Sequence, residues 1–392
     1  MEFRKVLYNE LSALMKENDK IIVLDADLGK PNGIYPLSQE YPDRYYQVGI
    51  AEANMAGICA GLSAYGYRPV MVTFAPFATR RAYDQIAVSI AYSKQKVIII
   101  GTDPGISAEL NGGTHMSFED VAIMRAIPDM VIYDACDVNQ FAQAFKELVN
   151  LDKNVYIRLP RKFQTEVFGE DYKYIYGKAD VLKEGKDVTI VATGTMVEQA
   201  LIANKLLVQE GISAEIISAN TIKPLDGETI LESVKKTKCV VTCENNNILG
   251  GLYSCVSELL ASNYPAVVLP VGVYDEFGQV GKYSDLLAAY KLTPKDIIEK
   301  VIITGHANYA DYGKDIVCAA VSSAAYLTAN TITDFLKVRS KAEADDGYML
   351  LELLEESEEA TKLLDGLEAH IRTLAKDYPR SIKVIYGGNT NA

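Results

Sequence analysis

One carboxylate stands where a strand-like run gives way to an apolar, small-residue helical segment. Glu52 follows Gln47 closely and has Ile50 and Met55 as apolar neighbours. At the start of a helix, a glutamate ordinarily complements the free N–H groups and the dipole of that helix. A buried carboxyl group can instead share a proton with a nitrogen atom of a ligand. Other segments of the chain are needed to distinguish these two interpretations.

Two further segments carry side chains that could bind a ligand. Phe74 and Phe77 stand at helical spacing after an apolar run, where they could equally be core aromatics. Residues 101–115 are rich in glycine and end in His115, and a simple turn would also explain them. None of these residues identifies a chemistry alone, so the elements that position them matter.

Short apolar runs alternate with helix-length segments through the first part of the chain. Uninterrupted apolar runs rich in β-branched residues are typical of strands buried on both faces of a parallel sheet. We therefore predict a doubly wound α/β domain over residues 1–170. Ligands of such sheets bind beyond the carboxyl ends of the strands, in the loops that contain Asp27, Phe77 and His115. The predicted strands are 21–24, 70–72, 97–100, 130–133 and 155–157, and the predicted helices are 52–65, 82–93, 119–126 and 139–149.

The alternation of apolar runs with helix-length segments restarts once and then gives way to a different pattern. Apolar runs at 188–191, 214–217 and 239–242 predict a second α/β domain over residues 180–302. A different module is predicted for residues 303–392: a helical run rich in Cys, Ala and Val, a strand at 348–353, an acidic amphipathic helix at 355–378 and a closing strand at 381–386. This order indicates a small α+β module.

Composition limits the classes of partner. The net charge of −13 and the pI near 4.9 argue against nucleic acid and anionic membranes as partners, because both would repel the surface. No apolar stretch reaches the ~20 uncharged residues that a membrane-spanning helix needs. The 6 cysteines lie mostly in apolar runs without a CxxC pair, and no signal-peptide pattern is present. We therefore expect a cytoplasmic protein with reduced thiols.

Taken in order, residues 5–302 resemble the pyrimidine-binding and C-terminal domains of thiamine-diphosphate enzymes, most closely the C-terminal subunit of split transketolases. The resemblance implies transfer of a two-carbon ketol unit between phosphorylated sugars, with thiamine diphosphate as the cofactor. It implies that Glu52 hydrogen-bonds the aminopyrimidine of the cofactor and that Phe77 stacks on this ring. Phe74 would line the same pocket, and Asp27 would lie at the cofactor edge of the subunit interface.

The resemblance also implies residues that bind the substrate. His115 would stabilise charge on sugar hydroxyls, and Arg161 would bind a substrate phosphate. The sequence departs from the family at two places. Asp103 stands where many transketolases carry a histidine, and Asn111 stands where they carry an aspartate that reads a sugar hydroxyl. We therefore expect an altered preference for the donor sugar.

The chain lacks the motif that holds the diphosphate and its metal. Such enzymes use a Gly-Asp-Gly followed by an asparagine to place a divalent cation on the phosphates. Because this pair is missing, we expect no metal ligand here and assign Mg²⁺ to a separate N-terminal subunit. The resemblance further implies a homodimer of heterodimers. From the second domain we expect architecture and dimer contacts.

The C-terminal segment, from about residue 301 to 392, is similar to the ribosomal-processing cysteine protease family. That likeness implies that Cys318 is a nucleophile and that His306 is its base. A cysteine in an Ala/Val run is more often an inert core residue. The first strand of these proteases is missing here, because residues 295–302 look like a transketolase helix instead.

Other functions remain open. Deoxyxylulose phosphate synthases and the beta subunits of 2-oxoacid dehydrogenases share the glutamate and a segment like residues 81–85. A cysteine peptidase that processes a ribosomal protein is a second alternative. A non-catalytic scaffold that has lost both chemistries is a third.

Overall fold

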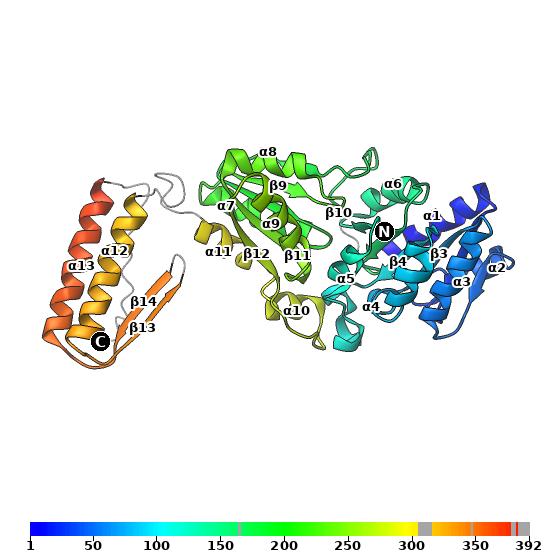
Figure 1. Ribbon diagram of the computed structural model, residues 1–392. Coiled ribbons are helices and arrows are strands. Elements are labelled where there is room, and N and C mark those ends of the chain that lie inside the picture. The colour runs from blue at the N-terminus through cyan, green and yellow to red at the C-terminus, as the bar shows by residue number, and fades with distance from the viewer. Residues whose placement is uncertain (164–165, 305–315, 346–347, 378–381, 383–392) are drawn as a thin grey trace. The chain divides into compact units, whose positions relative to one another are not determined.

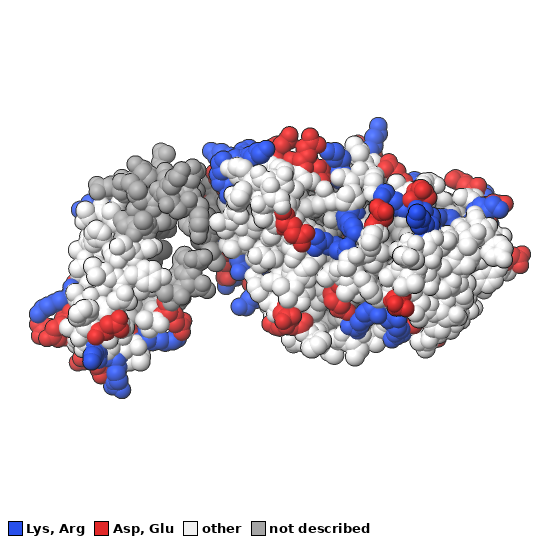
Figure 2. All heavy atoms as spheres, viewed as in Figure 1, with Lys and Arg blue, Asp and Glu red and all other residues white. Residues whose placement is uncertain are grey.

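The computed structural model describes residues 1–163, 166–304, 316–345, 348–377 and 382 (Figure 1). It divides into two compact units, Met1–Lys300 and Val301–Ala392. No helix among the described residues is both long and apolar enough to cross a membrane. On the visible face of the first unit, acidic and basic side chains are interspersed rather than gathered by sign (Figure 2).

The first unit contains a 7-stranded sheet in the order β10-β5-β6-β4-β3-β1-β2. All its neighbouring strands are parallel except β10, which runs antiparallel to β5. The predicted strands of the first domain all lie in this sheet, which confirms the predicted α/β class. The strands are β1 Ile21–Asp25, β2 Tyr45–Gln47, β3 Arg68–Phe74, β4 Ile98–Thr102, β5 Val131–Asp134, β6 Val155–Leu159 and β10 Thr221–Lys223.

Helices cover both faces of this sheet. Successive residues of a strand point to opposite faces, and on β3 Val70 and Val72 join one apolar core while Met71 joins the other. The first core also takes residues of α1 and α6, and the second takes residues of α3, η1 and α5. The helices are α1 Phe3–Glu17, α2 Leu37–Glu40, α3 Glu52–Ala64, α4 Ala75–Ala78, the π-helix η1 Gln85–Tyr92, the 3₁₀ turns η2 Gly105–Asn111 and η3 Gly113–His115, α5 Asp120–Ala126 and α6 Val138–Leu148.

A second, 5-stranded sheet has the order β12-β11-β8-β9-β7, with only β7 antiparallel to its neighbour. Its strands are β7 Asp180–Lys183, β8 Val188–Ala192, β9 Ala214–Ser218, β11 Cys239–Asn247 and β12 Val267–Val273. Its helices are α7 Met196–Gln209, α8 Gly227–Thr237, α9 Leu252–Asn263, α10 Tyr283–Ala289 and α11 Pro294–Thr304. Strand β10 lies between β9 and β11 in the sequence yet pairs with β5, so the second region contributes an edge strand to the first sheet.

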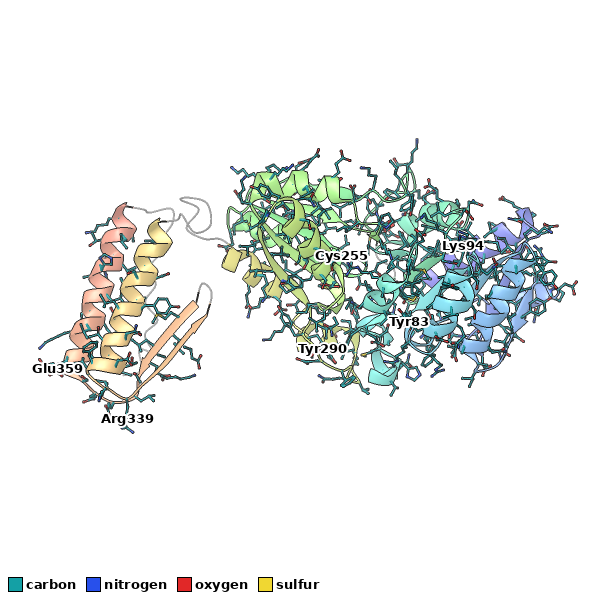
Figure 3. All side chains as sticks on the ribbon, in the orientation of Figure 1. Tyr83, Lys94, Cys255, Tyr290, Arg339 and Glu359 are labelled. Carbon is teal, nitrogen blue, oxygen red and sulfur yellow. The ribbon has the colours of Figure 1, made fainter. Side chains whose placement is uncertain are left out.

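The second unit contains helices α12 Ile316–Asn330 and α13 Glu358–Asp377, the π-helical turn η4 Thr331–Phe335, and a hairpin of β13 Ser340–Asp345 with β14 Tyr348–Leu353. Strand β14 lies where the sequence predicts a strand, whereas the sequence pattern did not anticipate β13. Arg339, labelled in Figure 3, pairs with Glu355 at the open end of the hairpin, with Nε 2.9 Å from Oε2. Apart from Ile382, the strand expected at 381–386 lies outside the described residues.

Candidate functional site

Glu52 is the first residue of α3 and its side chain is buried. Only 1% of the side chain is exposed, and Oε1 accepts a hydrogen bond of 2.8 Å from Nη1 of Arg81. Oε2 is buried without a hydrogen-bond partner among the described residues. Leaving a buried polar atom unpaired costs roughly 1–3 kcal/mol, and more for a charged group. An unpaired oxygen of this kind is what a ligand that donates a proton would satisfy.

Two phenylalanines and a histidine form an aromatic group beside this carboxylate. Phe74 ends β3 and Phe77 lies in α4, and their ring centroids are 6.0 Å apart. The ring of His115 lies edge-on to both, at 5.9 Å from Phe74 and 5.3 Å from Phe77. The guanidinium of Arg81 covers Phe77 at 3.7 Å from the ring centroid. The structure thus brings together residues from 52, 74–81 and 115, and we call Glu52, Phe77 and Arg81 the Glu52 wall.

His115 is held at the end of η3 by its neighbours. Its Nδ1 lies 2.9 Å from the hydroxyl of Thr114. Arg80 donates to the carbonyl of Thr114 at 3.0 Å and pairs with Glu119 at 2.9 Å. The imidazole is partly exposed, so its other nitrogen can meet a ligand.

Asp103 and Arg161 form a buried ion pair next to the aromatic group. Nε of Arg161 lies 2.6 Å from Oδ2 of Asp103, and its backbone N–H donates to Oδ1 at 3.0 Å. The Arg161 guanidinium also lies 4.7 Å from the ring centroid of Phe74. Burial raises the pKa of Asp103, although the cation beside it acts in the opposite direction. These contacts use Nε and the backbone N–H, so that among the described residues the Nη groups of Arg161 remain available to a ligand.

The other two predicted ligand-binding residues lie at the surface. Asp27 is exposed in the loop after β1, where it accepts a hydrogen bond of 2.9 Å from the side chain of Gln47. Its backbone is in the left-handed region, with φ of 61°. Asn111 is exposed at the end of η2. Within the described part of the chain, neither side chain contacts the aromatic group.

Residues 104–118, which we call the histidine loop, are held by the second sheet. The side chain of Asn245 in β11 accepts from the N–H of Ile106 at 2.9 Å and donates to the carbonyl of Pro104 at 3.1 Å. At the other end, the N–H of Asn247 donates to the carbonyl of Phe118 at 2.9 Å. A Cβ atom on Gly113 would collide with the backbone of Gly278. Two elements of the second sheet region therefore fix the loop that carries His115.

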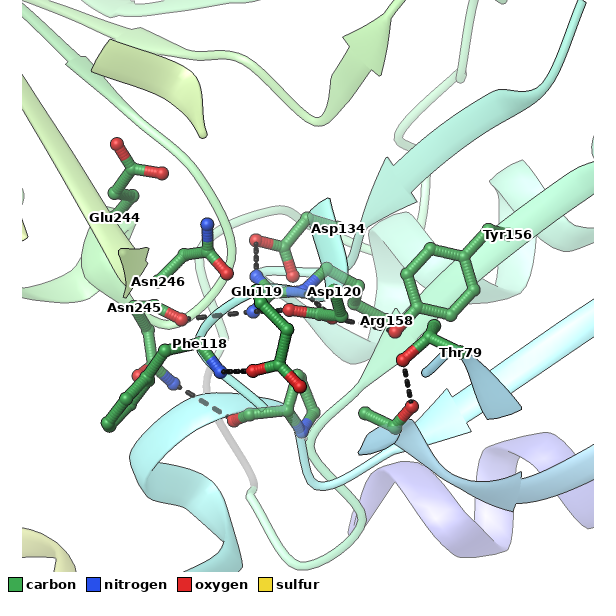
Figure 4. A network of polar contacts seen from close by, with 12 residues as sticks. Thr79, Phe118, Glu119, Asp120, Asp134, Tyr156, Arg158, Glu244, Asn245 and Asn246 are labelled. Carbon is green, nitrogen blue, oxygen red and sulfur yellow. Dashed lines mark hydrogen bonds and ion pairs between the residues drawn. The ribbon is translucent and has the colours of Figure 1, made fainter. Parts of the chain in front are cut away.

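A buried network anchors Asn245 in turn (Figure 4). Arg158 in β6 pairs with Asp120 and Asp134, each at 2.8 Å, and donates to the carbonyl of Asn245 at 3.0 Å. Burial alone would lower the pKa of Arg158, but the two carboxylates raise it above its ordinary value. The guanidinium therefore stays charged, and it ties the first sheet to the strand that holds the histidine loop.

Sequence reasoning missed Arg81 and Asn245 as site residues. A signal for Arg81 was present, because it stands four residues after Phe77, the spacing at which helical side chains meet. For Asn245 the signal was weaker: a polar Glu-Asn-Asn-Asn run directly after a buried apolar strand. The contacts it makes join residues about 140 positions apart, as in the bond from Ile106.

The predicted residues of the C-terminal segment cannot be placed. His306 lies outside the described residues, and although Cys318 falls in α12, its side chain also lies outside them. No group of three or more His, Cys, Asp or Glu side chains in the described part of the chain is arranged to hold a metal ion.

Comparisons with known proteins match three family models along the chain. Residues 1–164 match the transketolase pyrimidine binding domain, residues 177–297 match the transketolase C-terminal domain, and residues 288–383 match the cysteine protease Prp. The protease match begins within the C-terminal part of the transketolase match and includes all of helix α11, Pro294–Thr304.

Two proteins of similar sequence are named as transketolase subunits. The 6-deoxy-6-sulfo-D-fructose transketolase subunit of Clostridium sp. is 46% identical, over 72% of this chain and 88% of its own length. An apulose-4-phosphate transketolase subunit of Phocaeicola vulgatus is 32% identical, over 76% and 96%. A solved split-gene transketolase, an inactive beta4 tetramer, superposes with a TM-score of 0.70 at 40% identity, covering 77% of this chain and 97% of that one. With two transketolase domains in order and relatives matched over nearly their full length, this chain belongs to the family of split transketolase C-terminal subunits and carries a Prp protease-like region after them.

Proposed function

We propose that this chain supplies the pyrimidine half of a thiamine-diphosphate-dependent transketolase that moves a two-carbon ketol unit between sugars. The observation that carries the proposal is the Glu52 carboxylate, buried beside the ring of Phe77 with Oε2 unpaired among the described residues. These residues fit an aminopyrimidine, which needs a buried carboxylate at a ring nitrogen and an aromatic surface beneath the ring. When bound, thiamine diphosphate supplies the nucleophilic carbon that accepts the ketol unit.

Each residue of the chain has a proposed task toward that cofactor. Glu52 would hold a proton between its free oxygen and the ring nitrogen. Phe77 would fix the plane of the ring, with Phe74 closing the adjoining side. His115, edge-on to both rings, would donate to or accept from the sugar hydroxyls at the reacting end. Asp27, on its exposed loop, would contribute only at the subunit interface.

We further propose a sugar with an anionic terminus as the substrate. The two similar subunits described above are named for 6-deoxy-6-sulfo-D-fructose and apulose 4-phosphate, which share a terminal anion. Arg161 retains donors suited to such a group, and Asn111 is exposed where a sugar hydroxyl could meet it. Because Asp103 already neutralises part of the Arg161 charge, a phosphate dianion would be held less strongly than by a free arginine.

The remaining components belong to a partner. A separate N-terminal subunit would hold Mg²⁺ and the diphosphate, in a cytoplasmic homodimer of heterodimers. The proposed functional division of this chain is 1–170 for the pyrimidine, 180–302 for support and 303–392 for the protease-like segment. The protease match makes a cysteine peptidase, with Cys318 and His306, the second candidate function.

Co-expression with the N-terminal subunit tests the leading proposal. We expect ketol transfer that requires both thiamine diphosphate and Mg²⁺, and a loss of about 10³-fold or more in turnover for Glu52→Ala, since both the proton-sharing group and its charge are removed. Glu40→Ala is a control, because Glu40 bonds Tyr8 and Ser12 at the surface. A folded complex with no cofactor-dependent turnover would contradict the proposal.

A further inference from the structure

Arg81 makes two contacts at once in the Glu52 wall. Its Nη1 donates to Oε1 of Glu52 at 2.8 Å, and its guanidinium carbon lies 3.7 Å from the ring centroid of Phe77. A flat cation at that distance covers the face of the ring. One planar group thus satisfies the carboxylate and stacks on the phenylalanine.

The pair is asymmetric in its exposure. The Glu52 side chain is 1% exposed, whereas the Arg81 side chain is 43% exposed. Removing one partner of a buried ion pair is strongly destabilising, so the Arg81 cation stabilises the fold without ligand. A long side chain that is half in solvent can leave by rotating its own bonds, whereas Glu52 on the first turn of α3 cannot.

An aminopyrimidine would need the same two partners, namely the face of Phe77 that Arg81 covers and the Glu52 carboxylate, whose Oε2 is unpaired among the described residues. A ring stacked on Phe77 and bonded to Glu52 would occupy the space of the guanidinium, so the two groups exclude each other. A pyrimidine that shares a proton with Glu52 also brings positive charge to the carboxylate. Exchange of one for the other would therefore preserve the charge balance of the pocket.

We propose that Arg81 is a stand-in for the cofactor's aminopyrimidine: it fills the stack over Phe77 and neutralises Glu52 until the cofactor arrives, and then turns outward into solvent. The inference rests on the proposed function and adds a specific role for Arg81. When the cofactor ring stacks on Phe77, the guanidinium is displaced and its bond to Oε1 of Glu52 is lost with it, so Arg81 weakens the affinity of the resting protein for the cofactor. It does so while stabilising the protein without cofactor.

Calorimetric titration of thiamine diphosphate into the co-expressed complex, with Mg²⁺ present, tests this role. For Arg81→Met, which keeps an apolar stem without charge, we expect roughly tenfold tighter cofactor binding, since one partly exposed charge-assisted contact no longer has to be broken. We also expect a lower melting temperature without cofactor, restored when the cofactor is added. Arg44→Met is the matched control, because Arg44 also covers a ring, that of Tyr41 at 4.9 Å, away from the site.

A double-mutant cycle makes the test specific. In the Glu52→Gln background, Arg81→Met should change cofactor affinity far less than in the wild type, because the pair to be broken is already absent. Unchanged or weaker cofactor binding by Arg81→Met, with Glu52→Gln still impaired, would overturn the stand-in role and leave the proposed function intact. Equal cofactor binding by the wild type and Glu52→Gln would instead overturn the proposed function.

Discussion

The Glu52 wall and the histidine loop contribute Phe77 and His115 to the same aromatic group but are built differently. Glu52 and Phe77 lie on helices beside the first sheet, and Arg81 follows within the same segment. The histidine loop has only short 3₁₀ turns and is held by Asn245 and Gly278 from the second sheet region. A wall made by local elements depends on few distant residues, whereas a loop fixed by long-range contacts can be loosened from far away. We therefore expect the wall to determine cofactor affinity and the loop to determine turnover.

The largest effect on this comparison should come from Asn245→Ala. The change removes the bonds to Pro104 and Ile106 and frees the start of the histidine loop. Because small displacements of catalytic groups lower turnover strongly, we expect kcat to fall about 10- to 100-fold while the dissociation constant of thiamine diphosphate stays within a factor of about three. Steady-state kinetics and cofactor titration on the complex provide both numbers.

Asn220→Ala is the matched control for that variant. Asn220 is as buried as Asn245, but it bonds Asp180 at 2.9 Å and does not touch the histidine loop. A similar loss of stability without the loss of kcat is expected. If both variants lowered kcat equally, general destabilisation would explain the effect and the comparison would fail.

A smaller effect is expected from Asp103→Asn. The change removes the carboxylate that pairs with Arg161 and leaves the guanidinium free for the sugar terminus. We expect KM for a phosphorylated sugar to fall about threefold to tenfold, with a smaller change for a sulfonated sugar, because a dianion gains more from the released charge. Competition between the two sugars measures the ratio of their kcat/KM values directly. An unchanged ratio in Asp103→Asn would show that the Asp103–Arg161 pair does not select the substrate.

The smallest expected effect is a pH dependence of the protein's stability that comes from Glu244, the neighbour of Asn245 in β11. Burial raises the pKa of Glu244 to about 7, although the N–H groups of Leu252 and Tyr253 bond its carboxylate. The folded state therefore binds the proton of the Glu244 carboxyl group more tightly than the unfolded state does. The stability that Glu244 contributes to the fold is present below about pH 4.5 and is lost as pH rises through about 7. We expect the melting-temperature difference between the wild type and Glu244→Gln to shift against the wild type from pH 5 to 8. A pH-independent difference would contradict this account.

Much of the fold followed from local patterns in the sequence. The uninterrupted apolar runs predicted the strands around residues 21, 70, 98, 131 and 155, because strands buried on both faces leave no polar alternation. The helix that begins at Glu52 was also predicted at its first residue. Strand β13 was not foreseen, because its Lys, Glu and Asp residues give no apolar run.

The site was only partly accessible from sequence, for a physical reason. Glu52, Phe74, Phe77 and His115 follow strands or open helices, so their proximity follows from the topology. The pairing of β10 with β5 and the bond from Ile106 to Asn245 depend on distant partners that no local pattern encodes. The Asp103–Arg161 pair is similar, since each residue was expected to act separately and burial has joined them.

We expect the Glu52 wall to bind the cofactor and the histidine loop to determine turnover. One cofactor titration with parallel kinetics on the complex, comparing Glu52→Gln with Asn245→Ala, tests it most directly. We predict that Glu52→Gln weakens thiamine diphosphate binding about tenfold or more and lowers kcat, whereas Asn245→Ala lowers kcat alone. Loss of cofactor binding in Asn245→Ala, or full binding in Glu52→Gln, would contradict the account.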